Sequence, residues 1–212
     1  MKLSVIVSLL IFSSIESVYA QNAYVKLGQQ AFMDGDFKAA IQQLEKGCMA
    51  DSTDVNALWM LGYSYYHSDN YKKSIIAYTR VISIKPADAS AYYYRARAKS
   101  YMGKDNQLQP ADKEKYLLGA IFDFTKAIEI NTDPSDSKFY QNRGIAYRDY
   151  ALFKLEATPR CDKPRVINAL KASIADLEKV LNNDASRSDI SSLIEFSKEK
   201  LATLTAPTAV HH

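Results

Sequence analysis

The sequence has little of several residue types that mark particular classes of protein. Its 212 residues include seven glycines and six prolines, too few for a collagen-like or low-complexity chain. With 47% hydrophobic and 24% charged residues, it has the composition of a folded protein rather than a disordered one. The 27 basic residues nearly balance the 24 acidic ones, so charge gives no reason to expect nucleic acid as a partner.

The sequence also lacks the short motifs that build common catalytic sites. It contains no HExxH, CxxC, GxSxG, GxGxxG or P-loop pattern. Its three histidines are His67, His211 and His212, and two adjacent histidines at the end of a chain supply too few ligands for a metal. We therefore expect no enzyme activity, no cofactor and no metal site.

The first 20 residues have the pattern of a secretory signal. Lys2 is followed by an apolar, serine-rich run over 3–15, and Val18 and Ala20 are placed as the small residues before a cleavage site. A membrane anchor is the alternative, but 13 residues fall short of the ~20 needed to cross a bilayer. We predict cleavage after Ala20 and export to a bacterial periplasm or the exterior. The absence of an Asn-x-Ser/Thr acceptor favours the periplasm.

The strongest signal in the sequence is an internal repeat. Gly28, Gly62 and Ala96 lie 34 positions apart, and Gly144 follows 48 positions later. A second set of small residues follows these four, each with a large apolar residue four positions on: Ala40, Ser74, Ala120 and Ser173. Such a period is typical of paired helices whose small residues allow close approach, and whose apolar faces are buried only by stacking on neighbours.

This pattern resembles the tetratricopeptide repeat family, W-x2-L-G-x2-Y, then A-x3-F, then P. The second unit carries the fullest match: Leu58, Leu61, Gly62, Tyr65, Ser74, Tyr78 and Pro86. The resemblance extends over 23–181. It implies an all-α fold, a right-handed α-solenoid of antiparallel helix pairs closed by a C-terminal capping helix.

The repeat predicts one helical domain over 21–204, after a signal over 1–20 and before a flexible tail over 205–212. Its parts are four units and a capping helix, at about 21–54, 55–88, 89–134, 137–184 and 187–204. The third and fourth units carry 12 and 17 extra residues between their conserved halves. We expect these insertions to lengthen the helices into hairpins, with new helices starting near Pro110 and at Asp162.

The two cysteines, Cys48 and Cys161, are 113 positions apart. An exported compartment permits a disulfide between them. The repeat places them several layers apart, which favours two separate thiols.

In this family the first helix of each unit lines a concave groove that holds an extended peptide or a partner helix. The register assigns eight aromatic and basic residues to that groove: Phe32, Trp59, Tyr63, Tyr66, Tyr93, Arg97, Tyr101 and Arg148. Trp, Tyr and Arg are enriched at interface hot spots. The alternative is that the rings pack between helices, but we expect Trp59, Tyr63 and Tyr93 to be exposed in the groove. The two arginines either bind a carboxylate or remain solvated.

One departure from the family concerns its chaperone-binding members, which hold a C-terminal carboxylate with lysine, asparagine and arginine. The matching positions here carry other residues: Val25, Gln29, Met60, Ser90 and Tyr94. We therefore do not expect the chaperone-tail function.

The resemblance implies a non-enzymatic scaffold or adaptor that binds a protein segment in an aromatic-lined groove. One alternative is a cell-envelope glycan, because aromatic faces also stack on sugars. Another is self-assembly into a homo-oligomer through the long hairpins around 108–116 and 153–166. The sequence does not name the partner.

Overall fold

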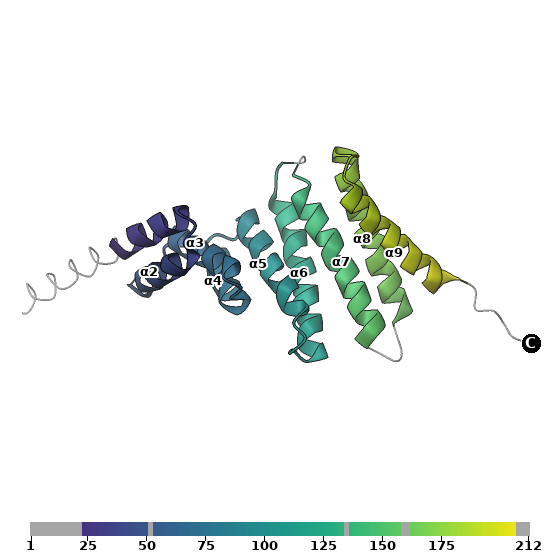
Figure 1. The fold of residues 1–212 in the computed structure, drawn as a ribbon, viewed down its shortest axis with the longest axis horizontal. Coiled ribbons are helices and arrows are strands. Elements are labelled where there is room, and N and C mark those ends of the chain that lie inside the picture. Colours follow the sequence, from purple (N-terminus) through teal and green to yellow (C-terminus); the bar gives the residue numbers. More distant parts are fainter. Residues whose placement is uncertain (1–22, 51–52, 134–135, 158–161, 207–212) are drawn as a thin grey trace, which may run out of the picture. The chain divides into compact units, whose positions relative to one another are not determined.

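A computed structural model describes residues 23–50, 53–133, 136–157 and 162–206. Within these ranges every regular element is a helix (Figure 1). A first helical segment covers 23–33, and the helices that follow are α2 (Phe37–Ala50), α3 (Val55–His67), α4 (Tyr71–Ile84), α5 (Ala89–Gly103), α6 (Pro110–Ile130), α7 (Lys138–Ala157), α8 (Lys163–Asn183) and α9 (Ser188–Thr205). The signal predicted over 1–20, Cys161 and the chain from 207 lie outside the described residues.

Aspartates in the linkers start several of these helices. The Asp54 side chain accepts a hydrogen bond of 3.0 Å from the Ala57 amide at the start of α3, and Asp162 caps α8 in the same way. These contacts satisfy backbone donors that the first helical turn leaves without a partner. α6 starts at Pro110, where the missing amide hydrogen costs nothing. The sequence predicts both Pro110 and Asp162 as helix starts.

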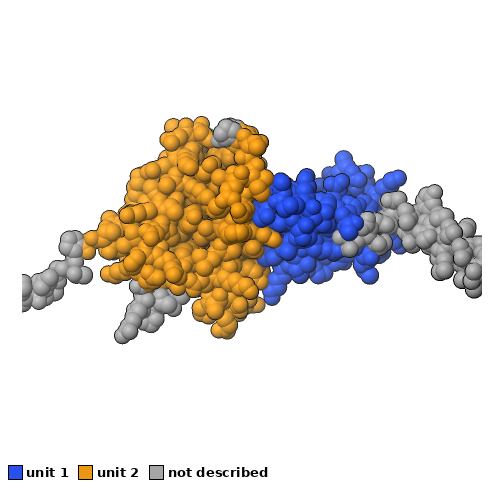
Figure 2. All heavy atoms as spheres, turned by 180° about the vertical axis from the view of Figure 1, so that it is seen from behind, with its two compact units in different colours: residues 1–94 blue, residues 95–212 orange. Residues whose placement is uncertain are grey.

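The chain divides into two compact units, residues 1–94 and 95–212, named unit 1 and unit 2 below (Figure 2). The boundary falls inside α5, whereas the sequence predicts one continuous domain over 21–204. In a repeat protein each element packs only on its neighbours, so no core crosses the whole chain and a division within a repeat array is expected.

In unit 1 the helices pair closely because small residues face large ones. A Cβ added at Gly28 would lie 2.6 Å from Leu44 Cγ, and one at Gly62 would lie 3.0 Å from the Tyr78 ring. The Ser74 hydroxyl donates a 2.9 Å hydrogen bond to the Gly62 carbonyl in the same contact. The small positions of the repeat therefore do what the sequence predicts, which is to let paired helices approach.

In unit 2 the inserted residues lengthen α6, α7 and α8 to 21, 20 and 21 residues. The lengthened ends do not lack apolar partners, because Leu117, Tyr150 and Val166 share a buried cluster with half-buried Phe153 beside them. The predicted hairpins thus contain a small core of their own.

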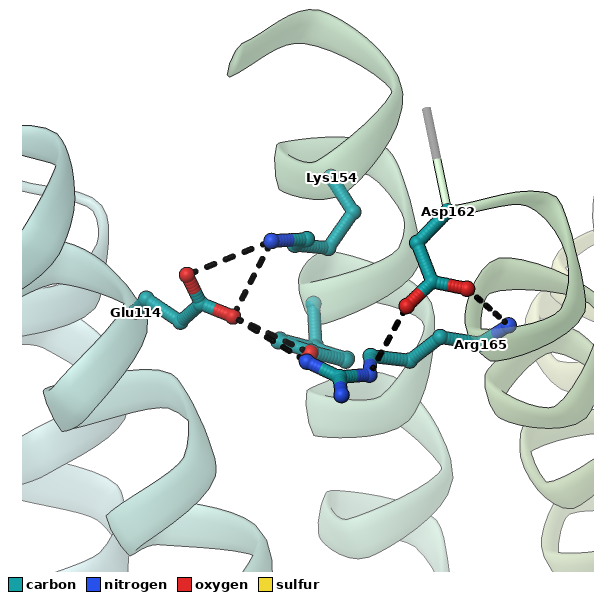
Figure 3. Close-up of polar contacts among 5 residues, drawn as sticks. Glu114, Lys154, Asp162 and Arg165 are labelled. Atoms are coloured by element: carbon teal, nitrogen blue, oxygen red, sulfur yellow. Dashed lines mark hydrogen bonds and ion pairs between the residues drawn. The ribbon is translucent and has the colours of Figure 1, made fainter. Parts of the chain in front are cut away.

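A polar network also joins these lengthened ends (Figure 3). Glu114 of α6 accepts hydrogen bonds of 3.1 and 3.3 Å from Lys154 Nζ of α7. Arg165 of α8 lies 3.9 Å from the same carboxylate and 3.3 Å from Asp162, its neighbour in the first turn. Tyr150 donates to Glu114 as well, at 3.2 Å. Three helices are therefore fixed at one end around a single carboxylate.

α9 covers α8 with one apolar face, as expected of a capping helix. Ile190 and Ile194 are buried in a cluster with Leu177 and Val180 of α8. Phe196 lies outside that face and is 37% exposed. No helix in the described part of the chain is both long and apolar enough to cross a membrane.

Candidate functional site

Three of the predicted groove residues meet in unit 1. Tyr63 stacks on Trp59 with ring centroids 5.4 Å apart and an interplanar angle of 17°. Phe32 meets both rings edge-on, at 6.4 Å from Trp59 and 5.4 Å from Tyr63. All three side chains are half-buried. The predicted groove face of unit 1 therefore has a contiguous aromatic wall, formed by the 23–33 segment and α3.

Rings that the groove register did not select extend this wall. Tyr94 meets Trp59 at 5.6 Å and Tyr63 at 5.0 Å, both edge-on. His67 lies 4.3 Å from Tyr63, and Phe37 stacks on His67 at 5.0 Å. From the sequence, Tyr94 is identified only as a position that matches the chaperone-binding members, and the spacing of Phe37, which follows a turn, gave no signal.

The prediction that Tyr93 is exposed in the groove is wrong, since only 7% of its surface is accessible. Tyr66, assigned to the same face, is 5% exposed. Both rings pack edge-on against Tyr94, at 5.2 and 6.0 Å. Their aromatic area is used within the protein, which is the alternative that the sequence left open.

Trp59 is held in one orientation by a short polar relay. Its indole Nε1 donates to Ser90 Oγ at 3.1 Å, and Ser90 donates to Asp88 Oδ1 at 2.7 Å. Asp88 also accepts from the Ala91 amide at 2.9 Å, which caps α5. The cap of one helix thus fixes the ring of another, and Trp59 needs little ordering when a ligand binds.

A cavity of about 380 Å³ opens beside this ring, lined by Val25, Gln29, Asp54, Asn56, Trp59 and Met60. Trp59 is one of the eight predicted groove residues, and Val25, Gln29 and Met60 are positions that match the carboxylate-binding residues of the chaperone-binding members. The lining combines an indole, two aliphatic side chains, two amides and one carboxylate, with no basic group. We call this cavity, with the Trp59–Tyr63–Phe32 wall, the unit 1 groove.

The predicted residues of unit 2 form a smaller and more polar site. Arg97 and Tyr101 line a pocket of about 110 Å³ with Lys104 and Asp149. Arg148 is not in its lining and donates from Nη2 to Asp149 at 2.9 Å, while Lys104 Nζ lies 2.6 Å from the other oxygen of that carboxylate. Two of the cations near this pocket are thus already paired with a carboxylate of the protein.

A third and larger cavity, of about 480 Å³, lies between α2, α3 and α4 of unit 1. The Tyr65 hydroxyl donates a short hydrogen bond to Glu45, which also accepts from Lys73 Nζ at 2.9 Å. These two donors lower the pKa of Glu45. Burial and the same bond raise the pKa of Tyr65. Cys48, which is buried, lines this cavity as well.

No group of three or more His, Cys, Asp or Glu side chains in the described part of the chain is placed to hold a metal ion. The described residues of these sites present rings, amides and isolated charges.

Residues 55–88, which include α3, α4 and Trp59, match the family model of the tetratricopeptide repeat. They coincide with the second unit of the repeat and contribute most of the unit 1 groove. A comparison with curated proteins finds no significant match.

Solved tetratricopeptide repeat structures share the fold. A crystal structure of MamA is 19% identical, with a TM-score of 0.54 over 91% of this chain and 98% of that one. A second MamA crystal structure is 25% identical, with a TM-score of 0.53 over 76% and 81%. The first tetratricopeptide repeat domain of Spaghetti (RPAP3), bound to the HSP90 peptide SRMEEVD, is 21% identical, with a TM-score of 0.51 over 72% and 96%. The chain thus has the fold of a tetratricopeptide repeat solenoid.

Proposed function

We propose that this chain is an exported, non-enzymatic scaffold that binds a segment of a partner protein in the unit 1 groove. The tetratricopeptide repeat fold suggests protein–protein interaction as the general role. Export is proposed from the sequence of residues 1–20. The non-enzymatic role is proposed from the sequence, which lacks the common catalytic motifs.

The observation that carries this proposal is the fixed Trp59 ring at the edge of a 380 Å³ cavity. Interface hot spots are enriched in tryptophan and tyrosine that lie in well-packed, preorganised pockets. Trp59 has such a setting, because Tyr63 stacks on one face and Ser90 fixes its nitrogen. A segment that covers the remaining surface of the ring buries apolar area at a low cost in entropy.

A comparative crosslinking experiment tests this role. The wild-type chain and a Trp59→Ala/Tyr63→Ala variant are crosslinked in the cells that make them, and bound proteins are identified by mass spectrometry. Tyr93 is left unchanged because it is buried. We expect specific partners to be lost in the variant while its circular dichroism retains the helical spectrum. Identical partners in both chains would show that the unit 1 groove does not bind them.

The lining of the cavity also favours a second candidate, a cell-envelope glycan. Sugars stack on aromatic faces and exchange hydrogen bonds with amides and carboxylates, and Gln29, Asn56 and Asp54 surround Trp59. Fluorescence titration with purified glycan fragments separates this candidate from peptide capture, because Trp59 is the single tryptophan of the chain. Saturable binding that Trp59→Ala abolishes, with the variant assayed by calorimetry because it has no tryptophan, would favour the glycan.

Self-assembly is the third possibility raised by the sequence, and the exposed Leu118 and Phe122 side chains on α6 give it a surface. Light scattering over a range of protein concentrations tests it. A mass that stays at the monomer value over this range would exclude self-assembly.

A further inference from the structure

We propose that the unit 1 groove selects a cationic side chain, lysine or arginine, from its partner segment. This inference rests on the proposed function and specifies the chemistry of the partner. The aliphatic stem of that side chain lies against Val25, Met60 and the indole of Trp59, and its charged head reaches Asp54.

The charges that face the cavity support this selection. Asp54 is the one ionisable side chain among the six lining residues, and no lysine, arginine or histidine is among them. Asp88, which orients Trp59 through Ser90, is outside this lining and is paired with Lys85 Nζ at 3.6 Å, so the negative charge of the lining comes from Asp54. A cation that enters the cavity meets a carboxylate, two amide oxygens and an aromatic ring.

The geometry of Asp54 makes its carboxylate a preorganised partner. Its Oδ1 accepts from the Ala57 amide at 3.0 Å, which fixes the side chain at the start of α3. A carboxylate with one oxygen held by a helix N-terminus still has lone pairs on the other for a charge-assisted hydrogen bond. Asp54 is half-buried, so a bound cation there is partly shielded from water.

The apolar part of the lining suits a long basic side chain. Lysine and arginine pack their methylene stems along apolar surface and keep the charged head near polar groups. Tyr63 stacks on one face of the Trp59 indole, so the ring presents its other face or its edge to the cavity. A stem of three or four methylenes can cover Val25, Met60 and this surface before the head reaches Asp54.

The same lining disfavours an acidic segment. A carboxylate placed in the cavity would lie near Asp54 with no basic side chain in the lining to compensate. Like charges at such a site reduce affinity and so provide specificity. The HSP90 peptide in the Spaghetti (RPAP3) structure carries two glutamates and an aspartate, so an acidic segment of that kind does not suit the lining of this groove.

The test uses the one indole signal of the chain as a site-specific probe. The 15N-labelled chain is titrated with three blocked amino acids, the N-acetyl methylamides of lysine, norleucine and glutamic acid, and the Trp59 indole cross-peak is followed by NMR. Norleucine has the lysine stem without its charge. We expect saturable shifts with lysine, at least fivefold weaker binding of norleucine and no response to glutamic acid.

Two matched variants isolate the role of the carboxylate. Asp54→Asn keeps an effective helix cap and removes the charge, because asparagine and aspartate are equally good N-caps. We expect it to weaken lysine binding at least fivefold and to leave norleucine binding unchanged. Asp36→Asn makes the same change where Asp36 accepts from the Ala39 amide at 3.0 Å, outside the cavity, and should have no effect.

Each result decides the proposal. Equal binding of the three compounds, no lysine-dependent shift, or an Asp54→Asn variant with undiminished lysine binding would each overturn cation selection. None of these results touches the scaffold role, which depends on the loss of crosslinked partners in the Trp59→Ala/Tyr63→Ala variant. If that loss is absent while lysine still binds, the cavity is a cation site and the scaffold function is wrong.

Discussion

Arg95 of α5 holds the fully buried Asp123 of α6 through two parallel hydrogen bonds, Nε to Oδ2 at 2.8 Å and Nη2 to Oδ1 at 2.7 Å. Lys99 adds a third at 2.7 Å. Arg143 and Asp176 repeat the arrangement in the next helix pair, at 2.7 and 2.8 Å. Both pairs occupy the positions just before the small and large residues of the repeat, so both helix pairs of unit 2 carry an ion pair at this position beside their apolar contacts.

The second repeat unit, residues 55–88, which matches the tetratricopeptide repeat model, has Leu61 and Ala77 at these same positions. We predict that Arg143→Leu alone lowers the free energy of unfolding by about 3 to 5 kcal/mol, because it leaves Asp176 buried without its partner. Arg143→Leu with Asp176→Ala should recover most of that loss, because it recreates an apolar pair. Urea unfolding of the three chains measures the difference. A double variant as unstable as the single one would contradict this account.

Replacing Ser90 tests whether its hydrogen bond orients the Trp59 ring. Ser90→Ala removes the acceptor of the indole Nε1 and should cost about 1 kcal/mol of stability, the usual net worth of one hydrogen bond. Because the ring then loses its fixed orientation, its fluorescence anisotropy should fall and partner affinity should weaken several-fold. Ser83→Ala, at an exposed position of α4, is the control. Unchanged anisotropy in Ser90→Ala would show that ring packing alone orients Trp59.

Two glycines of unit 2 should respond in opposite ways to the same substitution. A Cβ at Gly144 would lie 2.9 Å from Leu177 Cγ within a packed core, so Gly144→Ala should destabilise by about 1 to 3 kcal/mol. A Cβ at Gly119 would lie 3.3 Å from the flexible side chain of Lys99, and alanine favours the helix by about 1 kcal/mol. Thermal unfolding should therefore show a lower Tm for Gly144→Ala only.

Glu45 should make unit 1 sensitive to acid. Its pKa is lowered in the folded chain, first by the hydrogen bond from Tyr65 and then by the one from Lys73. A carboxyl group whose pKa is lower in the folded chain than in the unfolded chain stabilises the fold at pH values above its unfolded pKa, which is 4.5 for Glu45. This stabilisation is lost as the pH falls through the folded pKa. Glu45→Gln should lower stability at pH 7 and flatten its dependence on pH below about 4.5. Parallel pH dependence in both chains would exclude this contribution.

The architecture was predictable from the sequence because small residues recur at a fixed spacing. Gly28 and Gly62 face large side chains of the paired helix, and that requirement is visible as a period. Helix starts at Pro110 and Asp162 were predictable for a similar reason, since caps are local.

The candidate site was predictable in part. The register found Trp59, Tyr63 and Phe32, but it also selected Tyr66 and Tyr93, which are buried. Position along a helix fixes the direction of a side chain, whereas burial depends on neighbours such as Tyr94, which the period does not specify. The ion pairs of unit 2 escaped prediction for the same reason, because Arg95 and Asp123 are 28 residues apart and read separately as surface charges.

A photocrosslinking amino acid placed at Asn56, on the exposed rim of the cavity, tests the central claim most directly. The same amino acid at Ile76, 61% exposed on α4, is the control position in the same unit. The account predicts that Asn56 crosslinks to one discrete segment of a partner protein, rich in lysine or arginine, and that Trp59→Ala abolishes this product. Crosslinks that are equal at Ile76, or that persist in Trp59→Ala, would contradict binding in the unit 1 groove.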